Sequence, residues 1–117
     1  MSSIPVTVYH NPRCAKSREA LAYLDERKIT YEVVNYINEP LTFDQLNDVI
    51  DALNIDVASL VRKNEATWKT LFADKELEDD ELIFAMIEHP KLMQRPIVLA
   101  GDKAVIARPS SKIDDIL

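Results

Sequence analysis

The sequence predicts an α/β fold in which a mixed sheet carries helices on its faces. Residues 4–36 pass from a β-branched apolar run through a helical pattern to a second β-rich run, as in a β-α-β unit. A segment with helical patterns follows. Near the C-terminus, Gly101 and Asp102 separate two short apolar runs, a pattern typical of an antiparallel hairpin.

The N-terminal β-α-β unit rests on three segments. Residues 4–9 (IPVTVY) are rich in β-branched side chains and predict a buried strand. From Ala15 to Lys28, apolar residues recur at helical spacing, which predicts a helix. Residues 29–36 (ITYEVVNY) alternate well enough for a second strand. Because a helix joins the two strands, we expect a parallel pair with a right-handed crossover.

The middle of the chain predicts helices. Thr42 and Gln45 have the spacing of a capping box, and the helix they begin extends to Leu53. Residues 65–72 predict a short second helix. A third helix opens in the acidic stretch 76–81, since carboxylates are favoured at a helix N-terminus.

The C-terminal part completes the sheet. Residues 97–100 and 104–107 are apolar and form the two strands of the hairpin. Residues 110–117 predict a closing helix, with Ser110 or Ser111 as its cap. No repeat, low-complexity tract or flexible linker interrupts the 117 residues, so one domain is expected over residues 1–117.

Composition excludes several classes of function. The net charge of −6 argues against binding to nucleic acid or to an anionic membrane, because the field repels phosphates. The N-terminus has no signal-peptide pattern, and no apolar run approaches the ~20 residues that span a bilayer. A single cysteine cannot form an internal disulfide, which favours a reducing cytoplasm. One cysteine and two histidines also fall short of a zinc site, so no metal is expected.

The stretch VYHNPRCAKSREAL (residues 8–21) contains the single cysteine, Cys14, at the start of the predicted helix. Unpaired N–H groups and the positive end of the helix dipole favour a thiolate there. Arg13 and Lys16 flank the cysteine in sequence, and His10 lies four residues before it. Ser17, three residues after Cys14, could donate a hydrogen bond to sulfur. The alternative is that Cys14 is an inert packing residue, as isolated cysteines often are.

The positions of three arginines are the second indication of a functional site. Arg95 and Arg108 directly precede Pro96 and Pro109, so the two Arg-Pro pairs bracket the hairpin, while Arg62 lies in the helical segment. Guanidinium groups bind tetrahedral oxyanions through paired hydrogen bonds. Solvated surface charges are the alternative, because spacing alone does not show that the three arginines converge. Pro96 belongs at the start of a strand or in a tight turn, where a cis bond is an option.

Taken together, YHNPRCAKSREAL, Arg62, QRPIV and ARPSSKI resemble the glutaredoxin-dependent arsenate reductases of the ArsC type, in the same order from Val8 to the C-terminus. The resemblance implies a thioredoxin-like fold in a single domain with a helical insertion at about residues 40–92. It implies that Pro96 is the cis proline that faces the active cysteine.

The resemblance also implies a mechanism. The Cys14 thiolate attacks bound arsenate, glutathione attacks the adduct, and glutaredoxin completes the reduction to arsenite. Glutathione is thus a co-substrate, no cofactor is tightly bound, and a monomer is expected. The oxyanion-binding residues would be Arg62, Arg95 and Arg108. The residues supporting the thiolate would be His10, Asn11 and Ser17. Arg13 and Lys16 depart from the best-known members, which carry small or neutral residues there.

Two other readings of the same residues remain open. A thiol-dependent reductase or deglutathionylating enzyme would also use Cys14 alone, on another substrate. A Spx-like regulator shares the fold but binds RNA polymerase and typically carries Cys-x-x-Cys. In this chain Ser17 occupies the fourth position of that motif, which rules out an intramolecular redox switch.

Overall fold

The computed structural model describes residues 5–117, which form two compact units. The first unit contains the chain up to Glu39 together with Arg95–Leu117, and the second unit is Pro40–Gln94. The helical segment expected at about residues 40–92 falls in the second unit. The predicted first strand began at Ile4, which lies outside the described residues.

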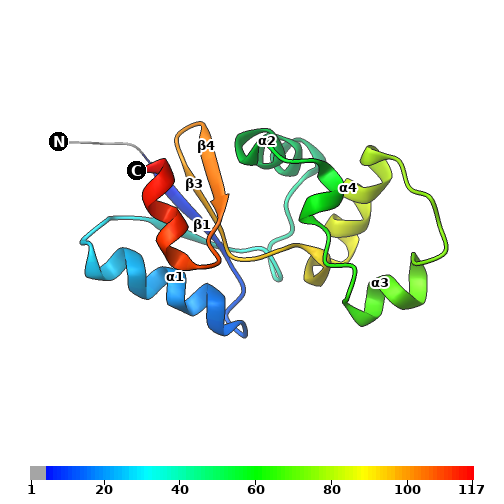
Figure 1. The fold of residues 1–117 in the computed structure, drawn as a ribbon, viewed down its shortest axis with the longest axis horizontal. Helices are drawn as coiled ribbons and strands as arrows, with labels where there is room; N and C mark the ends of the chain where they lie inside the picture. The colour runs from blue at the N-terminus through cyan, green and yellow to red at the C-terminus, as the bar shows by residue number, and fades with distance from the viewer. Residues whose placement is uncertain (1–4) are drawn as a thin grey trace. The chain divides into compact units, whose positions relative to one another are not determined.

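The first unit is built on a four-stranded mixed sheet in the order β2-β1-β3-β4 (Figure 1). β1 pairs parallel with β2 and antiparallel with β3, and β3 pairs antiparallel with β4. The predicted α/β class with its β-α-β unit and hairpin is therefore confirmed. The elements are β1 (Val6–His10), α1 (Ala15–Glu26), β2 (Glu32–Asn35), β3 (Ile97–Ala100), β4 (Lys103–Ile106) and the 3-10 helix η3 (Ser110–Ile116).

The core of this unit lies between one face of the sheet and the helices α1 and η3. Val8 and Val98 from neighbouring strands are fully buried there, with Leu24 of α1 and Ile113 of η3. Burying each such side chain contributes about 1.5–3 kcal/mol. The burial in β1 alternates along the strand, so Val6, Val8 and His10 share this face. The packing therefore fixes the end of β1 from which the Cys14 loop departs.

Two element boundaries and one helix cap are among the predictions that differ from the structure. α1 ends at Glu26 rather than Lys28, because Lys28 adopts a left-handed backbone with φ of 58°. The second strand is limited to Glu32–Asn35, the residues that pair with β1 at the sheet edge. The closing helix has no serine cap. Pro109 occupies its N-cap position, and the Lys112 N–H donates to the Pro109 carbonyl at 3.1 Å in a 3-10 pattern.

The second unit is helical. Its elements are α2 (Phe43–Leu53), η1 (Val57–Leu60), α3 (Ala66–Leu71), α4 (Asp79–Glu88) and η2 (Pro90–Leu92). The predicted capping box at α2 is present: the Gln45 N–H donates to Thr42 Oγ1 at 3.2 Å, and the Thr42 N–H donates to Gln45 Oε1 at 2.9 Å. α4 begins with a second capping box, between Glu78 and Glu81, that the sequence analysis did not predict.

A short antiparallel bridge joins Val61 to Met93 in the second unit. Beside it, the Arg62 N–H donates to the Leu92 carbonyl at 2.6 Å and the Gln94 N–H donates to the Leu60 carbonyl at 2.8 Å. These bonds fix the backbone from which the Arg62 side chain departs. Within residues 5–117, no helix has the length and apolar character needed to cross a membrane.

Candidate functional site

The strand registers bring Cys14, Arg95 and Arg108 to the same end of the sheet. Tyr9, at the C-terminal end of β1, is paired with Ile97, the first residue of β3, and Ile97 is paired with Ile106, the last residue of β4. Cys14 follows β1 by four residues, Arg95 precedes β3 by two, and Arg108 follows β4 by two. The Ala107 N–H donates to the Pro96 carbonyl at 2.9 Å, which ties the two arginine segments together.

Hydrogen bonds within the loop from β1 to α1 hold Cys14 as the N-cap residue of α1. The Cys14 N–H donates to the Asn11 carbonyl at 2.9 Å, and the Arg13 N–H donates to Asn11 Oδ1 at 3.1 Å. Cys14 has an extended backbone with φ of −97° and ψ of 122°, as an N-cap residue should. Its side chain is therefore placed beside the unpaired N–H groups of the first helical turn.

Arg18 closes this loop from the helix side. Its Nη1 donates to the Pro12 carbonyl at 2.8 Å. Arg18 lies in the motif around Cys14, but no role was predicted for it from the sequence. Its position could have indicated this role, because a long side chain in the second turn of α1 can reach back over the loop.

The environment of Cys14 favours the thiolate. Burial disfavours the charge, but the backbone N–H of Ser17, the Arg95 cation and the backbone N–H of Lys16 together outweigh it. A side-chain hydrogen bond from Arg95 acts in the same direction, so the pKa of the Cys14 thiol is lowered from its ordinary value. Cys14 is partly exposed and has no disulfide partner. A low-pKa, accessible thiol is the pattern of a reactive cysteine rather than an inert one.

Ser17 acts on the Cys14 thiol through its backbone, and the role predicted for its hydroxyl stays a prediction. The Cys14 side chain makes no capping hydrogen bond in the described structure, but the backbone N–H of Ser17 acts to lower the pKa of the thiol. The hydroxyl oxygen accepts from the Asn11 N–H at 3.4 Å, and the whole residue is buried. Asn11 thus supports the site through its backbone and side chain, by fixing the loop around Cys14.

His10 is not among the groups that lower the pKa of the Cys14 thiol, and its supporting role stays a prediction. Its own pKa is lowered, first by burial and then by the nearby Arg18 cation, against a backbone hydrogen bond with Ser17 that raises it. His10 is only 7% exposed and is therefore neutral at neutral pH. A neutral imidazole does not attract the thiolate as a cation would.

Arg95 has unused hydrogen-bonding capacity beside Cys14. Its Nε and Nη1 atoms are buried and have no partner in the described structure, although the side chain hydrogen-bonds Cys14. His10 Nδ1 is also buried without a partner. Buried donors without partners are rare in proteins and call for a ligand or water. The Arg95 guanidinium is therefore free to bind an oxyanion next to the sulfur.

The remaining predicted residues divide between the two units. Arg108 belongs to the first unit, and it is exposed. The Arg95–Pro96 bond is cis, as is the Arg108–Pro109 bond. Arg62 lies in the second unit, where its Nη1 is 3.1 Å from Glu65 Oε2 and 3.2 Å from the Lys91 carbonyl oxygen.

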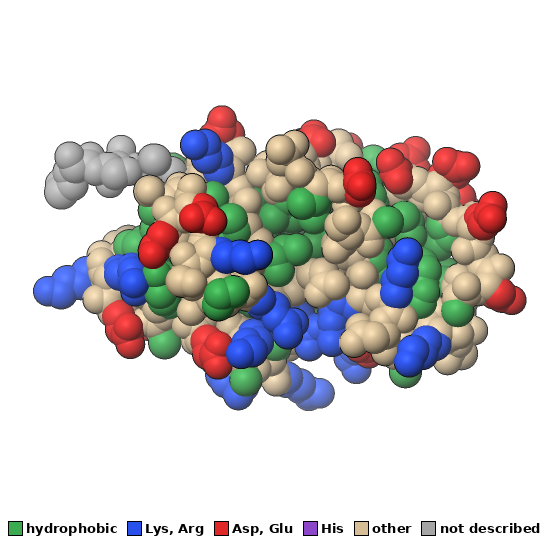
Figure 2. Space-filling view, viewed as in Figure 1, with side chains coloured by type: hydrophobic (Ala, Val, Ile, Leu, Met, Phe, Trp, Pro, Cys, Tyr) green, Lys and Arg blue, Asp and Glu red, His purple; other side chains and the backbone are tan. Residues whose placement is uncertain are grey.

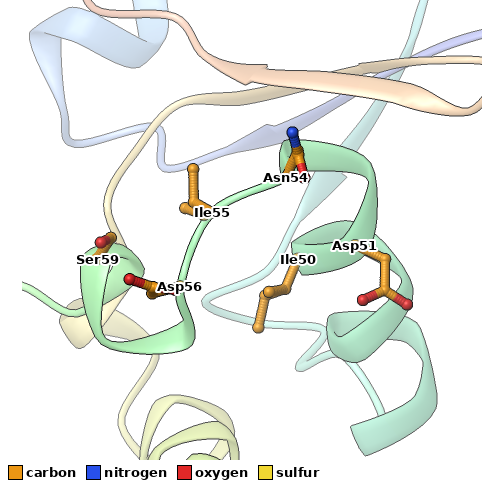
Figure 3. A pocket seen from close by; sticks show the side chains of 6 residues that line it. All are labelled: Ile50, Asp51, Asn54, Ile55, Asp56 and Ser59. Carbon is orange, nitrogen blue, oxygen red and sulfur yellow. The ribbon is translucent and has the colours of Figure 1, made fainter.

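The second unit also contains a shallow pocket of about 450 Å³ (Figure 3). The residues lining it are Ile50, Asp51, Asn54, Ile55, Asp56 and Ser59. This lining contains neither a nucleophilic thiol nor a cation, so it fits neither part of the predicted chemistry. No group of three metal-ligating side chains occurs among the described residues.

Comparison with known proteins gives consistent matches. The family model that matches is described as the ArsC family and covers residues 9–116. Arsenate reductase of Neisseria meningitidis serogroup A is 40% identical over 114 residues, which is 96% of this chain and 97% of that protein. Uncharacterized protein YfgD of Escherichia coli K12 is 44% identical over 96% of each chain.

A solved structure described as arsenate reductase from Vibrio cholerae is similar in fold. Its TM-score is 0.93 at 37% identity, and the match covers 99% of this chain and 100% of that one. This likeness confirms the thioredoxin-like fold expected from the sequence.

Proposed function

Because this chain belongs to the ArsC family, we propose that it is an arsenate reductase whose nucleophile is the Cys14 thiolate. The observation that carries the proposal is the pairing of Cys14 with Arg95. The thiol is favoured as a thiolate, and the guanidinium that hydrogen-bonds it retains buried donors without a partner. A nucleophile beside a cationic oxyanion binder is what displacement at a tetrahedral oxyanion requires.

In the first step, the Cys14 sulfur forms a bond to arsenic, and one arsenate oxygen leaves as water after protonation. Arsenic remains As(V) at this stage. In the second step, the thiolate of glutathione attacks the adduct, and the two thiols become joined in a disulfide. The two electrons they give up reduce arsenic to As(III), which leaves as arsenite. Glutaredoxin then reduces the mixed disulfide and restores Cys14.

The arginines have different places in this proposal. Arg95 binds the oxyanion beside the sulfur, and Arg108 adds positive charge at the same end of the sheet. Both would stabilise the negative charge that is redistributed as the oxygen leaves. The resemblance also assigns Arg62 to the oxyanion. Its guanidinium already contacts Glu65 and Lys91, so this role would require the cation to share or exchange those partners.

The partners follow from the cysteine count. With one cysteine in the chain, the remaining electrons must come from external thiols, which are glutathione and glutaredoxin in this proposal. No tightly bound cofactor is needed. The protein would act in the reducing cytoplasm, where its thiol stays reduced, and as a monomer.

The test is arsenate-dependent oxidation of NADPH, coupled through glutathione reductase, glutathione and glutaredoxin. We expect NADPH consumption that requires arsenate, glutaredoxin and Cys14, with Cys14→Ser as the inactive control. Arg62→Ala in the same assay tests the third arginine separately. Full activity of Cys14→Ser would contradict the mechanism. A fast-reacting thiol without arsenate dependence would indicate a thiol-dependent reductase with another substrate.

A further inference from the structure

We infer that Arg13 and Lys16 form a subsite for the carboxylates of the small thiol that reacts second at Cys14. This inference rests on the proposed function, since it names where that second thiol binds. It concerns the two cations nearest to Cys14 in the sequence.

Both residues adjoin Cys14, Arg13 in the preceding loop and Lys16 in the first turn of α1. Arg13 is joined to Cys14 by a peptide bond, and the backbone N–H of Lys16 is among the groups that lower the pKa of the Cys14 thiol. The side chains of Arg13 and Lys16 are exposed, whereas Ser17 on the inner side of the same turn is buried. Both cationic side chains therefore reach solvent from positions that adjoin the nucleophile in the chain.

Neither cation is strongly engaged within the protein. The Arg13 guanidinium has no partner in the described part of the chain, where only its backbone N–H is bonded, to Asn11 Oδ1. Lys16 Nζ lies 3.5 Å from Glu19 Oε2, with both side chains about half exposed. Exposed pairs of this kind are weak, so a carboxylate on a ligand can replace Glu19.

The charge around Cys14 is opposite in sign to that of the whole chain. Residues 11–18 (NPRCAKSR) contain three cations and no carboxylate, in a protein of net charge −6. Figure 2 shows Lys and Arg side chains gathered over the loop that joins β1 to α1. A local positive field of this kind raises the concentration of anionic reactants at the sulfur.

Arg95 has a different role from Arg13 and Lys16 in this inference. Arg95, with buried donors and no partner for them, suits the oxyanion, and His10 Nδ1 is a second buried polar atom without a partner. Arg13 and Lys16 are exposed, so they suit a ligand that approaches Cys14 from solvent, as a second thiol would. A thiol that carries free carboxylates, such as glutathione, would bind both cations as its sulfur approaches. A neutral thiol would gain nothing from them.

The subsite can be tested without arsenate, by thiol–disulfide exchange. The Cys14 thiolate attacks oxidised glutathione, a Cys14–glutathione disulfide forms, and one glutathione thiolate leaves, with no net oxidation. The same exchange with the neutral hydroxyethyl disulfide serves as the reference. The ratio of the two rates cancels changes in Cys14 ionisation, because the same thiolate attacks both disulfides.

We expect wild-type protein to prefer the anionic disulfide, and the Arg13→Gln/Lys16→Gln variant to lose on the order of tenfold of that preference. Added salt should weaken the wild-type preference, because both cations are exposed. The matched control is Lys28→Gln/Lys103→Gln, which removes the same charge. Lys28 lies beyond the far end of α1, and Lys103 begins β4 at the sheet end away from Cys14.

The inference is overturned if wild type shows no preference, if the Arg13/Lys16 variant keeps it, or if the control variant loses it equally. In the arsenate assay, the Arg13/Lys16 variant should raise the KM for glutathione and leave the KM for arsenate near its wild-type value. An intact exchange preference without arsenate turnover would remove the proposed function and keep the subsite for anionic thiols. Arsenate turnover without the exchange preference would support the proposed function and overturn the subsite. A Cys14 that reacts with neither disulfide would overturn both proposals.

Discussion

The Arg18 guanidinium donates a 2.8 Å hydrogen bond to the Pro12 carbonyl, two residues before the nucleophile, and its charge also lowers the pKa of His10. The Arg18 side chain thus fixes the loop and disfavours protonation of His10. The loop geometry around Cys14 therefore depends on a residue of the α1 surface as well as on the sequence of the loop.

Replacing Arg18 tests these two roles. In Arg18→Gln the pKa of His10 should rise toward its ordinary value, because a cation that disfavours imidazolium has been removed. Burial would still hold that pKa below the ordinary value. Arg18→Lys is the matched control, since it keeps the charge but not the planar guanidinium. NMR titration of His10 should separate the variants, and equal pKa values in wild type and Arg18→Gln would contradict the assignment.

The second prediction concerns Arg95. In Arg95→Gln the pKa of the Cys14 thiol should rise, because a nearby cation and a hydrogen bond to sulfur are both lost. Thiolate absorbance or the alkylation rate measured against pH reports this change. Arsenate turnover should also fall by about 10²–10³-fold, as when one donor to a developing oxyanion is removed. Lys103→Gln, at the other end of the sheet, should change neither property.

A third prediction concerns stability at low pH. The pKa of His10 is lowered in the folded protein, so the unfolded chain binds the proton more readily. The stability due to neutral His10 is therefore fully present above the unfolded pKa of about 6.5 and is lost as pH falls toward the folded pKa. Denaturant titrations at several pH values should show this loss in wild type but not in His10→Asn. Parallel pH profiles for the two proteins would argue against it.

The capping box of α2 gives a fourth prediction, confined to the second unit. Thr42→Ala removes the oxygen that accepts from the Gln45 N–H, which should lower the free energy of unfolding by about 1 kcal/mol. Thr42→Ser keeps that oxygen and should retain most of the stability. Denaturant melts followed by circular dichroism would measure both variants. Equal losses in the two would assign the effect to the methyl group instead of the cap.

Local features of this chain could be predicted because a few neighbouring residues determine them. Thr42 and Gln45 form their capping box within one turn. Cys14 is the N-cap residue of α1 because the loop before it is short and the helical pattern begins directly after it. The box at Glu78 was missed because glutamate is outside the preferred N-cap set. The serine cap of the closing helix failed because Pro109 takes the N-cap position.

The site itself could be predicted only in part. The residue types were visible in the sequence, but the proximity of Arg95 to Cys14 depends on the register of β1 against β3, which spacing along the chain does not reveal. The role of Ser17 also depended on orientation. Its hydroxyl and its N–H are equally close in sequence to Cys14, and only the helical backbone decides that the N–H faces the sulfur.

The pairing of β1 with β3 joins segments from opposite ends of the chain, and this has a consequence for how the protein folds. The helices of the second unit form from local contacts, whereas the first unit must close a loop over most of the chain before its sheet is complete. Cys14 meets Arg95 only after that closure. During refolding, helical signal should therefore return before the thiol becomes acidic, and the reactivity of Cys14 marks the moment when the sheet has assembled.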